Sequence, residues 1–299
     1  MTRTNPLLTP ASAEVALADV CQRTGLDRNN AELLRMGENA IFRTADGVIV
    51  RIGRSPETSS KEVRVARWLE AAQFPAARLH DELPQPMMAN GFSVTFWRFI
   101  RETAPPPSPA DLGSVLQNLH SLVPSADLDL PMFSPIPKLA ARLRDLPKGA
   151  LPQSDTDFLR RRGDELQAEF ETLQFELPAG VIHGDAHGGN LMRDENGAVL
   201  LIDFEDFAWG PREWDASMAA IRYQVFGRLS RSEYESYVST YGFDPLLWSG
   251  FPVLRAIREL NMTAWLMQQL GQSAEVDAEV KKRLADLRND QFPRFWGVF

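Results

Sequence analysis

The chain has 299 residues, a formal net charge of −8 and a sequence pI near 5.2. One hydrophobic core rarely holds so many residues, so we expect two lobes, and the acidic balance argues against nucleic acid as a partner. No apolar run reaches the length of a membrane span, the N-terminus lacks the apolar core of a signal peptide, and the single cysteine, Cys21, excludes an intramolecular disulfide. We therefore expect a reducing, cytoplasmic setting and no membrane partner.

The N-terminal part of the chain alternates helical and strand patterns. A helix is expected over Ala11–Gly25, with the glycine ending it. The segment Leu34–Ile52 has strand character and is interrupted by the turn Ala45-Asp46-Gly47, which predicts a β-hairpin. A second helix over Lys61–Ala72 and a further strand over Gly91–Ile100 complete a small β-rich region.

A proline-rich segment, Thr103–Pro109, can continue neither a sheet nor a helix and marks the exit from a connector between lobes. We expect a nucleotide-binding lobe over residues 1–98 and a helical lobe, with the catalytic loop and an acceptor pocket, over residues 99–299. The one β interruption expected in the second lobe is a hairpin at Asn196-Gly197. The predicted helices after the connector are Pro109–Leu122, Pro137–Leu146, Asp155–Leu173, Ser230–Tyr241, Val253–Leu270 and Glu275–Asn289.

Three oxygen-bearing side chains carry the chemistry in this second part. Asp185 is followed after four intervening residues by Asn190, and Asp203 then ends an apolar run. A two-residue turn at Asn196-Gly197 would place Asn190 directly opposite Asp203, whereas a four-residue turn over Asp194–Gly197 would shift the pairing by two residues. This order fits a site that holds Mg²⁺ and positions a hydroxyl for phosphoryl transfer.

The motif set resembles the aminoglycoside phosphotransferase family, which includes choline-kinase-like and other small-molecule kinases. The resemblance rests on His183–Asn190 and Ile202-Asp203-Phe204, with support from Val50-Arg51, Leu119-His120 and the run from Gly210 to Asp215. It implies an α+β, protein-kinase-like fold of two lobes, with ATP as donor (GTP as the alternative) and Mg²⁺ as cofactor.

The resemblance also implies roles for single residues. Asp185 would orient the acceptor hydroxyl and accept its proton, and Asn190 and Asp203 would bind Mg²⁺. Arg51 would contact the nucleotide phosphates, since no lysine lies in its strand. Glu62 would pair with Arg51, although Ser59–Glu62 also fits a capping box at a helix start.

Other candidate residues lie around this set. Trp97 and Phe99 fall in the connector, where adenine would bind, and they fit core packing equally well. We interpret His183 and His187 as structural residues that hold the loop by hydrogen bonds, and the resemblance implies that Asp215 braces the catalytic loop. The carboxylates proposed for binding amines of the acceptor are Glu205, Asp206 and Glu259, with the C-terminal carboxylate of Phe299 as a further candidate.

The sequence therefore predicts an ATP- and Mg²⁺-dependent O-phosphotransferase acting on a small, amine-bearing molecule such as an aminoglycoside-like antibiotic, an amino sugar or an amino alcohol. A silent kinase-fold binding protein is the first alternative. A metallophosphoesterase is the second, because Gly184–Gly188 fits its Gly-Asp-x-His-Gly element; however, no histidine follows His187 to complete such a site. The sequence carries no signal for an oligomeric state.

Overall fold

The computed structural model describes residues 7–125, 128–289 and 292–297, so Phe299 lies outside the described residues. By their contacts the residues form two compact units. The first comprises Met1–Pro107, Ser121–Pro131 and Gly188–Phe207, and the second comprises Ser108–His120, Met132–His187 and Ala208–Phe299. Within the described part of the chain, no helix combines the length and the apolar character needed to cross a bilayer. The lobe boundary at residue 98 remains a prediction.

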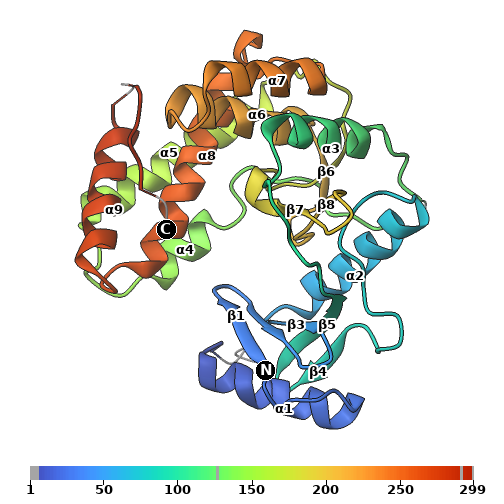
Figure 1. Cartoon of the computed structure of the whole chain (residues 1–299). Coiled ribbons are helices and arrows are strands. Elements are labelled where there is room, and N and C mark those ends of the chain that lie inside the picture. Colours follow the sequence, from blue (N-terminus) through green and yellow to red (C-terminus); the bar gives the residue numbers. More distant parts are fainter. Residues whose placement is uncertain (1–6, 126–127, 290–291, 298–299) are drawn as a thin grey trace. The chain divides into compact units, whose positions relative to one another are not determined.

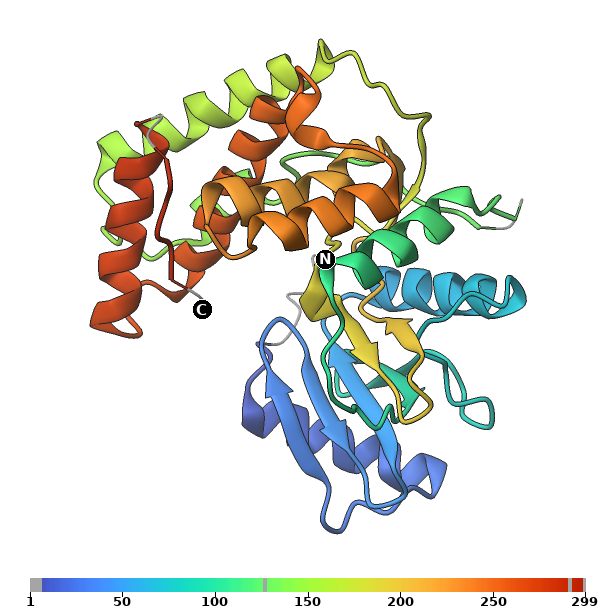
Figure 2. The same ribbon diagram turned by 45° about the horizontal axis from the view of Figure 1, so that its top comes forward.

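The first unit contains a five-stranded antiparallel sheet in the order β1-β2-β3-β5-β4. Alternate residues of β3 are buried, as expected for a strand with one face on a core. Helix α1, capped by Thr9 and ended by Gly25 in the left-handed region, packs on this sheet (Figure 1). The bounds are α1 Pro10–Thr24, β1 Glu32–Met36, β2 Ala40–Arg43, β3 Val48–Gly53, β4 Met87–Ala89 and β5 Phe92–Arg98. All but β4 lie where the sequence predicted them, and β1, β2 and β3 run side by side in blue in Figure 2.

Helix α2, Pro56–Ala71, begins earlier than predicted. Ser55 is its N-cap and accepts a hydrogen bond from the Thr58 amide, and Pro56 has its backbone preset for the first helical position. Ser59 lies inside the helix, where its amide donates to the Ser55 carbonyl at 3.1 Å. The predicted capping box that would have engaged Glu62 is therefore wrong.

A hairpin of β7, Leu191–Arg193, and β8, Val199–Leu201, also belongs to the first unit. The Asn196-Gly197 turn is present, but Leu191 pairs with Leu201, so both predicted registers are wrong. Asp194 and Ala198 close a three-residue turn with Gly197 at φ 82°, and the Asp194 side chain accepts from the amides of Asn196 and Ala198. A left-handed glycine at the third loop position is the usual geometry of three-residue hairpins.

The one-residue shift places Asn190 level with Ile202, whose amide donates to the Asn190 carbonyl at 3.0 Å. In a regular ladder this shift would turn Asn190 and Asp203 to opposite faces. Neither residue is in a strand, however. Asn190 ends the 3-10 turn η1, Gly188–Asn190, and Asp203 has φ 65°, in the left-handed region that side chains rarely adopt. The alternation rule therefore does not determine where these two side chains point.

The second unit is mainly helical, and its long helices α5 and α8 pack together (Figure 2). Two short strands, β6 and β9, pair antiparallel, so the prediction of a single β interruption is wrong; three residues are too few to show an alternating pattern. Helix α6 was also missed, because all of its residues are buried and it has no polar face. The bounds are α3 Pro109–Ser121, α4 Leu139–Asp145, α5 Gln153–Glu171, β6 Gly180–Ile182, β9 Ala208–Gly210, α6 Glu213–Ala220, a π-helix Ile221–Val225, α7 Arg231–Tyr241, η3 Pro245–Leu247, α8 Phe251–Leu266, η4 Met267–Gln269 and α9 Ala274–Leu287.

Candidate active site

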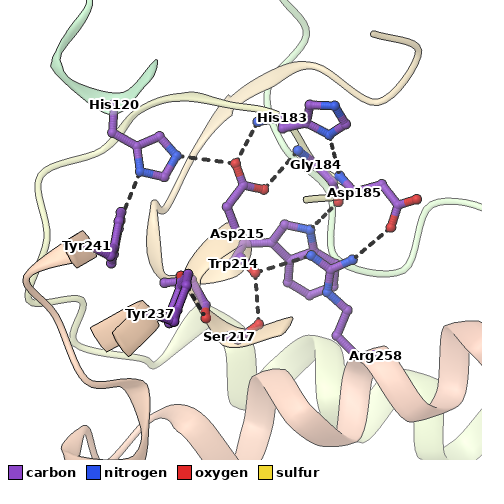
Figure 3. A network of polar contacts seen from close by, with 11 residues as sticks. His120, His183, Gly184, Asp185, Trp214, Asp215, Ser217, Tyr237, Tyr241 and Arg258 are labelled. Carbon is purple, nitrogen blue, oxygen red and sulfur yellow. Dashed lines mark hydrogen bonds and ion pairs between the residues drawn. The ribbon is translucent and has the colours of Figure 1, made fainter. Parts of the chain in front are cut away.

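The loop after β6 is held by a buried carboxylate of α6. Asp215 accepts hydrogen bonds from the amides of His183 at 2.6 Å and Gly184 at 2.9 Å, and it is 1% exposed (Figure 3). Its neighbour Trp214 donates from Nε1 to the Gly184 carbonyl at 2.7 Å. These hydrogen bonds satisfy backbone amide and carbonyl groups of the two residues before Asp185. They therefore fix the direction in which the loop presents the Asp185 side chain.

A histidine on α3 supports this carboxylate. His120 Nε2 lies 3.2 Å from Asp215 Oδ2, and its Nδ1 lies 2.8 Å from the hydroxyl of Tyr241 on α7. Burial alone would raise the pKa of Asp215, but the hydrogen bond and charge of His120, together with the His183 amide, hold that pKa below its usual range. Asp215 is thus an ionised, fully buried anchor for the loop.

Asp185 is positioned differently, since its side chain is 44% exposed. Its Oδ2 lies 3.4 Å from His187 Nε2 and its Oδ1 lies 3.5 Å from Arg258 Nη1. Its amide donates to His183 Nδ1 at 3.3 Å. Desolvation opposes ionisation, yet the hydrogen bond and charge of His187 and the charge of Arg258 lower the pKa of Asp185 well below its usual range. Asp185 is an ionised group that can accept a hydrogen bond from a hydroxyl.

In the first unit, one arginine is surrounded by carboxylates. Arg51 Nη1 lies 2.7 Å from Glu62 and 3.1 Å from Asp203, and Nη2 lies 2.7 Å from Glu205. The predicted pairing of Glu62 with Arg51 is therefore present. Burial, at 2% exposure, raises the pKa of Glu62 to about 7, against the lowering effect of Arg51.

The donor set of this cluster fits a hard divalent cation. Oxygen atoms of Glu62, Asp203 and Glu205 lie within 4.8 Å of one another. Asn190, whose backbone carbonyl accepts a hydrogen bond from the Ile202 amide, carries a carboxamide and is 5% exposed. Mg²⁺ takes oxygen ligands and retains several waters, so Asp203 and Asn190 are suitable ligands for it.

The connector residues have packing roles in the first unit. Trp97 is 8% exposed, its ring meets Phe204 edge to face at 5.6 Å, and its Nε1 donates to the Thr95 hydroxyl. Phe99 is 39% exposed, with the guanidinium of Arg43 5.1 Å from its ring centre. Of the two, Phe99 has the more accessible face.

The three predicted acceptor carboxylates lie in different environments. Glu205 is paired with Arg51 and also accepts from Asn39 Nδ2 at 3.1 Å, and Asp206 is half-buried. Glu259 is 2% exposed and lies 2.9 Å from Arg294, itself 4% exposed. Glu259 is therefore a buried, paired carboxylate in this structure, and its contact with an acceptor stays a prediction.

Sequence reasoning missed Arg258. Arg258 precedes Glu259 on α8, and the helical pattern of α8 does not reveal which of the two side chains reaches the loop that carries Asp185. Asn39 belongs to Gly37–Asn39, a segment between two strands that the sequence weakly predicts to cover the ATP phosphates, because it lacks a glycine-rich pattern; in the structure its Nδ2 donates to Glu205.

Comparisons with known proteins show the family and the fold of the chain. The profile of the phosphotransferase enzyme family matches residues 35–260. A search of curated proteins found no match. Three similar solved structures are the amicoumacin kinase hAmiN in complex with AMP-PNP, Ca²⁺ and Ami, a choline/ethanolamine kinase family protein from Mesorhizobium loti, and a spectinomycin phosphotransferase in complex with ADP and spectinomycin.

Their likeness extends over nearly the whole chain. The amicoumacin kinase has a TM-score of 0.69 at 15% identity, covering 94% of this chain and 96% of its own. The M. loti protein has a TM-score of 0.62 at 19% identity with 95% of each chain covered, and the spectinomycin enzyme 0.64 at 14% with 91% and 97% covered. These likenesses confirm the predicted kinase-like α+β fold. The chain belongs to the phosphotransferase enzyme family and is, by that membership, a small-molecule phosphotransferase.

Proposed function

We propose that the protein transfers the γ-phosphoryl group of ATP, with Mg²⁺, to a hydroxyl of a small, amine-bearing molecule. The observation that carries this proposal is the ionised, half-exposed carboxylate of Asp185 in a loop whose backbone is anchored by Asp215. It lies five positions before Asn190, in a chain that also supplies Asp203 with its carboxylate partners.

Asp185 would act mainly by orienting the acceptor. Phosphoryl transfer passes through a loose transition state, so alignment of the hydroxyl contributes more than a strong base does. A carboxylate with a lowered pKa is a weak base but a good hydrogen-bond acceptor. Asp185 would hold the hydroxyl toward the phosphorus and take its proton as the new bond forms.

The residues of the first unit would hold the donor nucleotide. Arg51, oriented by Glu62, presents a planar fork of donors that suits phosphate oxygens. When bound by Asn190 and Asp203, Mg²⁺ would neutralise charge on the phosphates. The lobe boundary near residue 98 and a contact of Phe99 with the adenine belong to this proposal.

The proposal of an amine-bearing acceptor is based on the predicted acceptor carboxylates and on the names of similar proteins. The choline/ethanolamine kinase family protein and the spectinomycin phosphotransferase carry names of amine-bearing compounds. Asp206, a half-buried carboxylate three residues after Asp203, would contact an amine of the acceptor. We place the reaction in the cytoplasm, where ATP is available and the buried thiol of Cys21 stays reduced.

An ATP-consumption screen tests the proposal. Purified protein with Mg²⁺ is incubated with ATP or GTP and with aminoglycosides, tuberactinomycin-like peptides, choline, homoserine or amino sugars. We expect at least one amine-bearing acceptor to stimulate nucleotide consumption, and Asp185→Ala to abolish it while nucleotide binding persists. Slow hydrolysis that no acceptor stimulates would favour the silent binding protein, and bound Mn, Fe or Zn in the purified protein would favour a metallophosphoesterase.

A further inference from the structure

We propose that Arg258 is a positioning residue, which holds the carboxylate of Asp185 in the orientation needed to align the acceptor hydroxyl. This inference rests on the proposed function. Arg258 comes from the middle of α8, 73 positions after Asp185 in the chain, and no motif of the sequence marked it. Figure 3 shows its guanidinium directed at the catalytic loop.

The guanidinium is fixed by three contacts within the second unit. Its Nη1 lies 3.5 Å from Asp185 Oδ1, its Nη2 donates to the Trp214 carbonyl at 3.2 Å, and its Cζ lies 3.7 Å from the centre of the Trp214 ring. The Arg258 side chain is 6% exposed, against 44% for Asp185. A buried, stacked cation thus lies beside an accessible carboxylate.

Trp214 joins this contact to the backbone of the loop. Its Nε1 donates to the carbonyl of Gly184, the residue just before Asp185. Its own carbonyl accepts from both Arg258 and the Ser217 hydroxyl, at 3.2 Å and 2.8 Å. Arg258 is therefore held by the same residue that holds the loop, which gives a fixed frame from α8 through α6 to the Asp185 side chain.

The groups around the Asp185 carboxylate include one permanent positive charge, that of Arg258. The described groups that face its carboxylate are Arg258 from α8 and His187 from its own loop, with His183 nearby. His187 is 31% exposed, and an imidazole carries a charge only when it is protonated, whereas a guanidinium is always charged. Arg258 supplies the constant part of the field that keeps Asp185 ionised.

An arginine suits this position better than a lysine would. Only a planar guanidinium can stack on the Trp214 ring while directing one nitrogen to a carbonyl and another to a carboxylate. A lysine would keep the charge but lose the stack and the second hydrogen bond. We therefore expect Arg258→Lys to recover part of what Arg258→Gln loses.

The first readout is phosphate release from Mg·ATP, with water as the acceptor. Arg258→Gln should lower kcat by about 10²-fold, as expected for a misplaced catalytic group, with the KM for ATP within about twofold of wild type. Arg258→Lys should recover about tenfold of that loss, since it retains the charge. Arg294→Gln is the matched control, because it removes another buried arginine that pairs with a carboxylate of α8. It should lower the melting temperature without this loss of kcat.

The second readout is the titration of the Asp185 carboxyl carbon by ¹³C NMR, with Asp185→Asn giving the assignment. The titration midpoint should move to higher pH in Arg258→Gln and remain unchanged in Arg294→Gln. If Arg258→Gln does not fold, both measurements are made on Arg258→Lys, for which we expect a smaller loss of kcat and a smaller shift of the titration midpoint. Both the loss of kcat and the shifted midpoint are required; either result alone indicates a merely structural arginine and overturns the inference. A wild type that no acceptor of the panel stimulates, or an Asp185→Asn variant as active as wild type, would instead overturn the proposed function.

Discussion

Arg51 on β3 and Glu62 on α2 form an ion pair of 2.7 Å, with Glu62 2% exposed and the Arg51 side chain 12% exposed. The same guanidinium reaches Asp203 and Glu205, so a single cation serves three carboxylates. Removing one partner of a buried pair leaves the other charge without its compensation, and this makes the pair sensitive to substitution. In the proposed function, Glu62 sets the direction in which Arg51 meets phosphate.

The first prediction concerns nucleotide affinity. Glu62→Gln should weaken nucleotide binding by about tenfold or more, because a hydrogen bond to a charged group contributes about 1.5–3 kcal/mol. Isothermal titration with Mg·AMP-PNP measures the change. Ser55→Ala is the control, since it removes the cap of the same helix and should cost about 1 kcal/mol of stability with no loss of affinity. Equal affinity losses in both variants would mean that Glu62 acts only through the helix.

The second prediction concerns the anchor of the catalytic loop. Asp215→Asn should lower the free energy of unfolding by about 3 kcal/mol at neutral pH, because an amide nitrogen would face the backbone donors of His183 and Gly184. Chemical denaturation of the two proteins gives this difference directly. Turnover should fall with it, since the loop carries Asp185.

The pH dependence of that difference follows from the pKa of Asp215, which folding lowers from its ordinary value of 3.8. The unfolded state then binds the proton more readily, so the stabilisation is complete above the unfolded pKa and is lost as the pH falls through 3.8 toward the folded pKa. Wild type should lose more stability than Asp215→Asn as the pH is lowered from about 5 to about 3. Parallel curves over that range would show that Asp215 is not the group responsible.

The third prediction sets packing against helix propensity. Replacing glycine by alanine inside a helix usually gains up to about 1 kcal/mol. At Gly113 of α3, however, the new Cβ would lie 2.9 Å from the Tyr237 carbonyl of α7, and overpacking costs typically about 1–3 kcal/mol. Gly113→Ala should therefore be less stable than wild type in urea denaturation.

Gly163 of α5 is the matched control for that variant. A Cβ there would meet the end of the Leu139 side chain at 2.6 Å, which can rotate away, whereas a backbone carbonyl cannot. We expect Gly163→Ala to retain wild-type stability or gain slightly. Equal stability of the two variants would argue against a close contact of α3 with α7.

Periodic segments and local turn chemistry were predictable from the sequence. The strands of the first unit and the long helices of the second followed their apolar patterns. The register of the β7–β8 hairpin was not predictable, because Asn196-Gly197 allows either a two-residue or a three-residue loop. The Asp194 side chain selects the longer loop by accepting hydrogen bonds from the amides of Asn196 and Ala198. The same three-residue form occurs at Ala45–Gly47, where it was correctly predicted.

Contacts between distant segments were the part that the sequence could not predict. The motif marks Asp185, Asn190 and Asp203 as candidates, whereas the residue of α8 that contacts Asp185 depends on the tertiary contacts of that helix. Glu259 is covered by Arg294 from the C-terminal segment, and its neighbour meets the catalytic loop. Similarly, the sequence allows a capping box with Glu62, but in the structure Ser55 is the N-cap of α2, so Glu62 lies too far into the helix for that role.

The proposed metal and nucleotide site is tested most directly by measuring Mn²⁺ binding in the presence of AMP-PNP. Bound Mn²⁺ is detected as a loss of the electron paramagnetic resonance signal of the free ion. Wild type should bind the ion together with the nucleotide, and Asp203→Ala and Asn190→Ala should weaken it by at least about 100-fold, since even an outer partner of a metal ligand is typically worth 10–100-fold. Asp206→Asn, close in sequence but not assigned as a ligand, should bind as wild type does. If Asp203→Ala held Mn²⁺ and AMP-PNP as tightly as wild type, the proposed phosphoryl-transfer site would be contradicted.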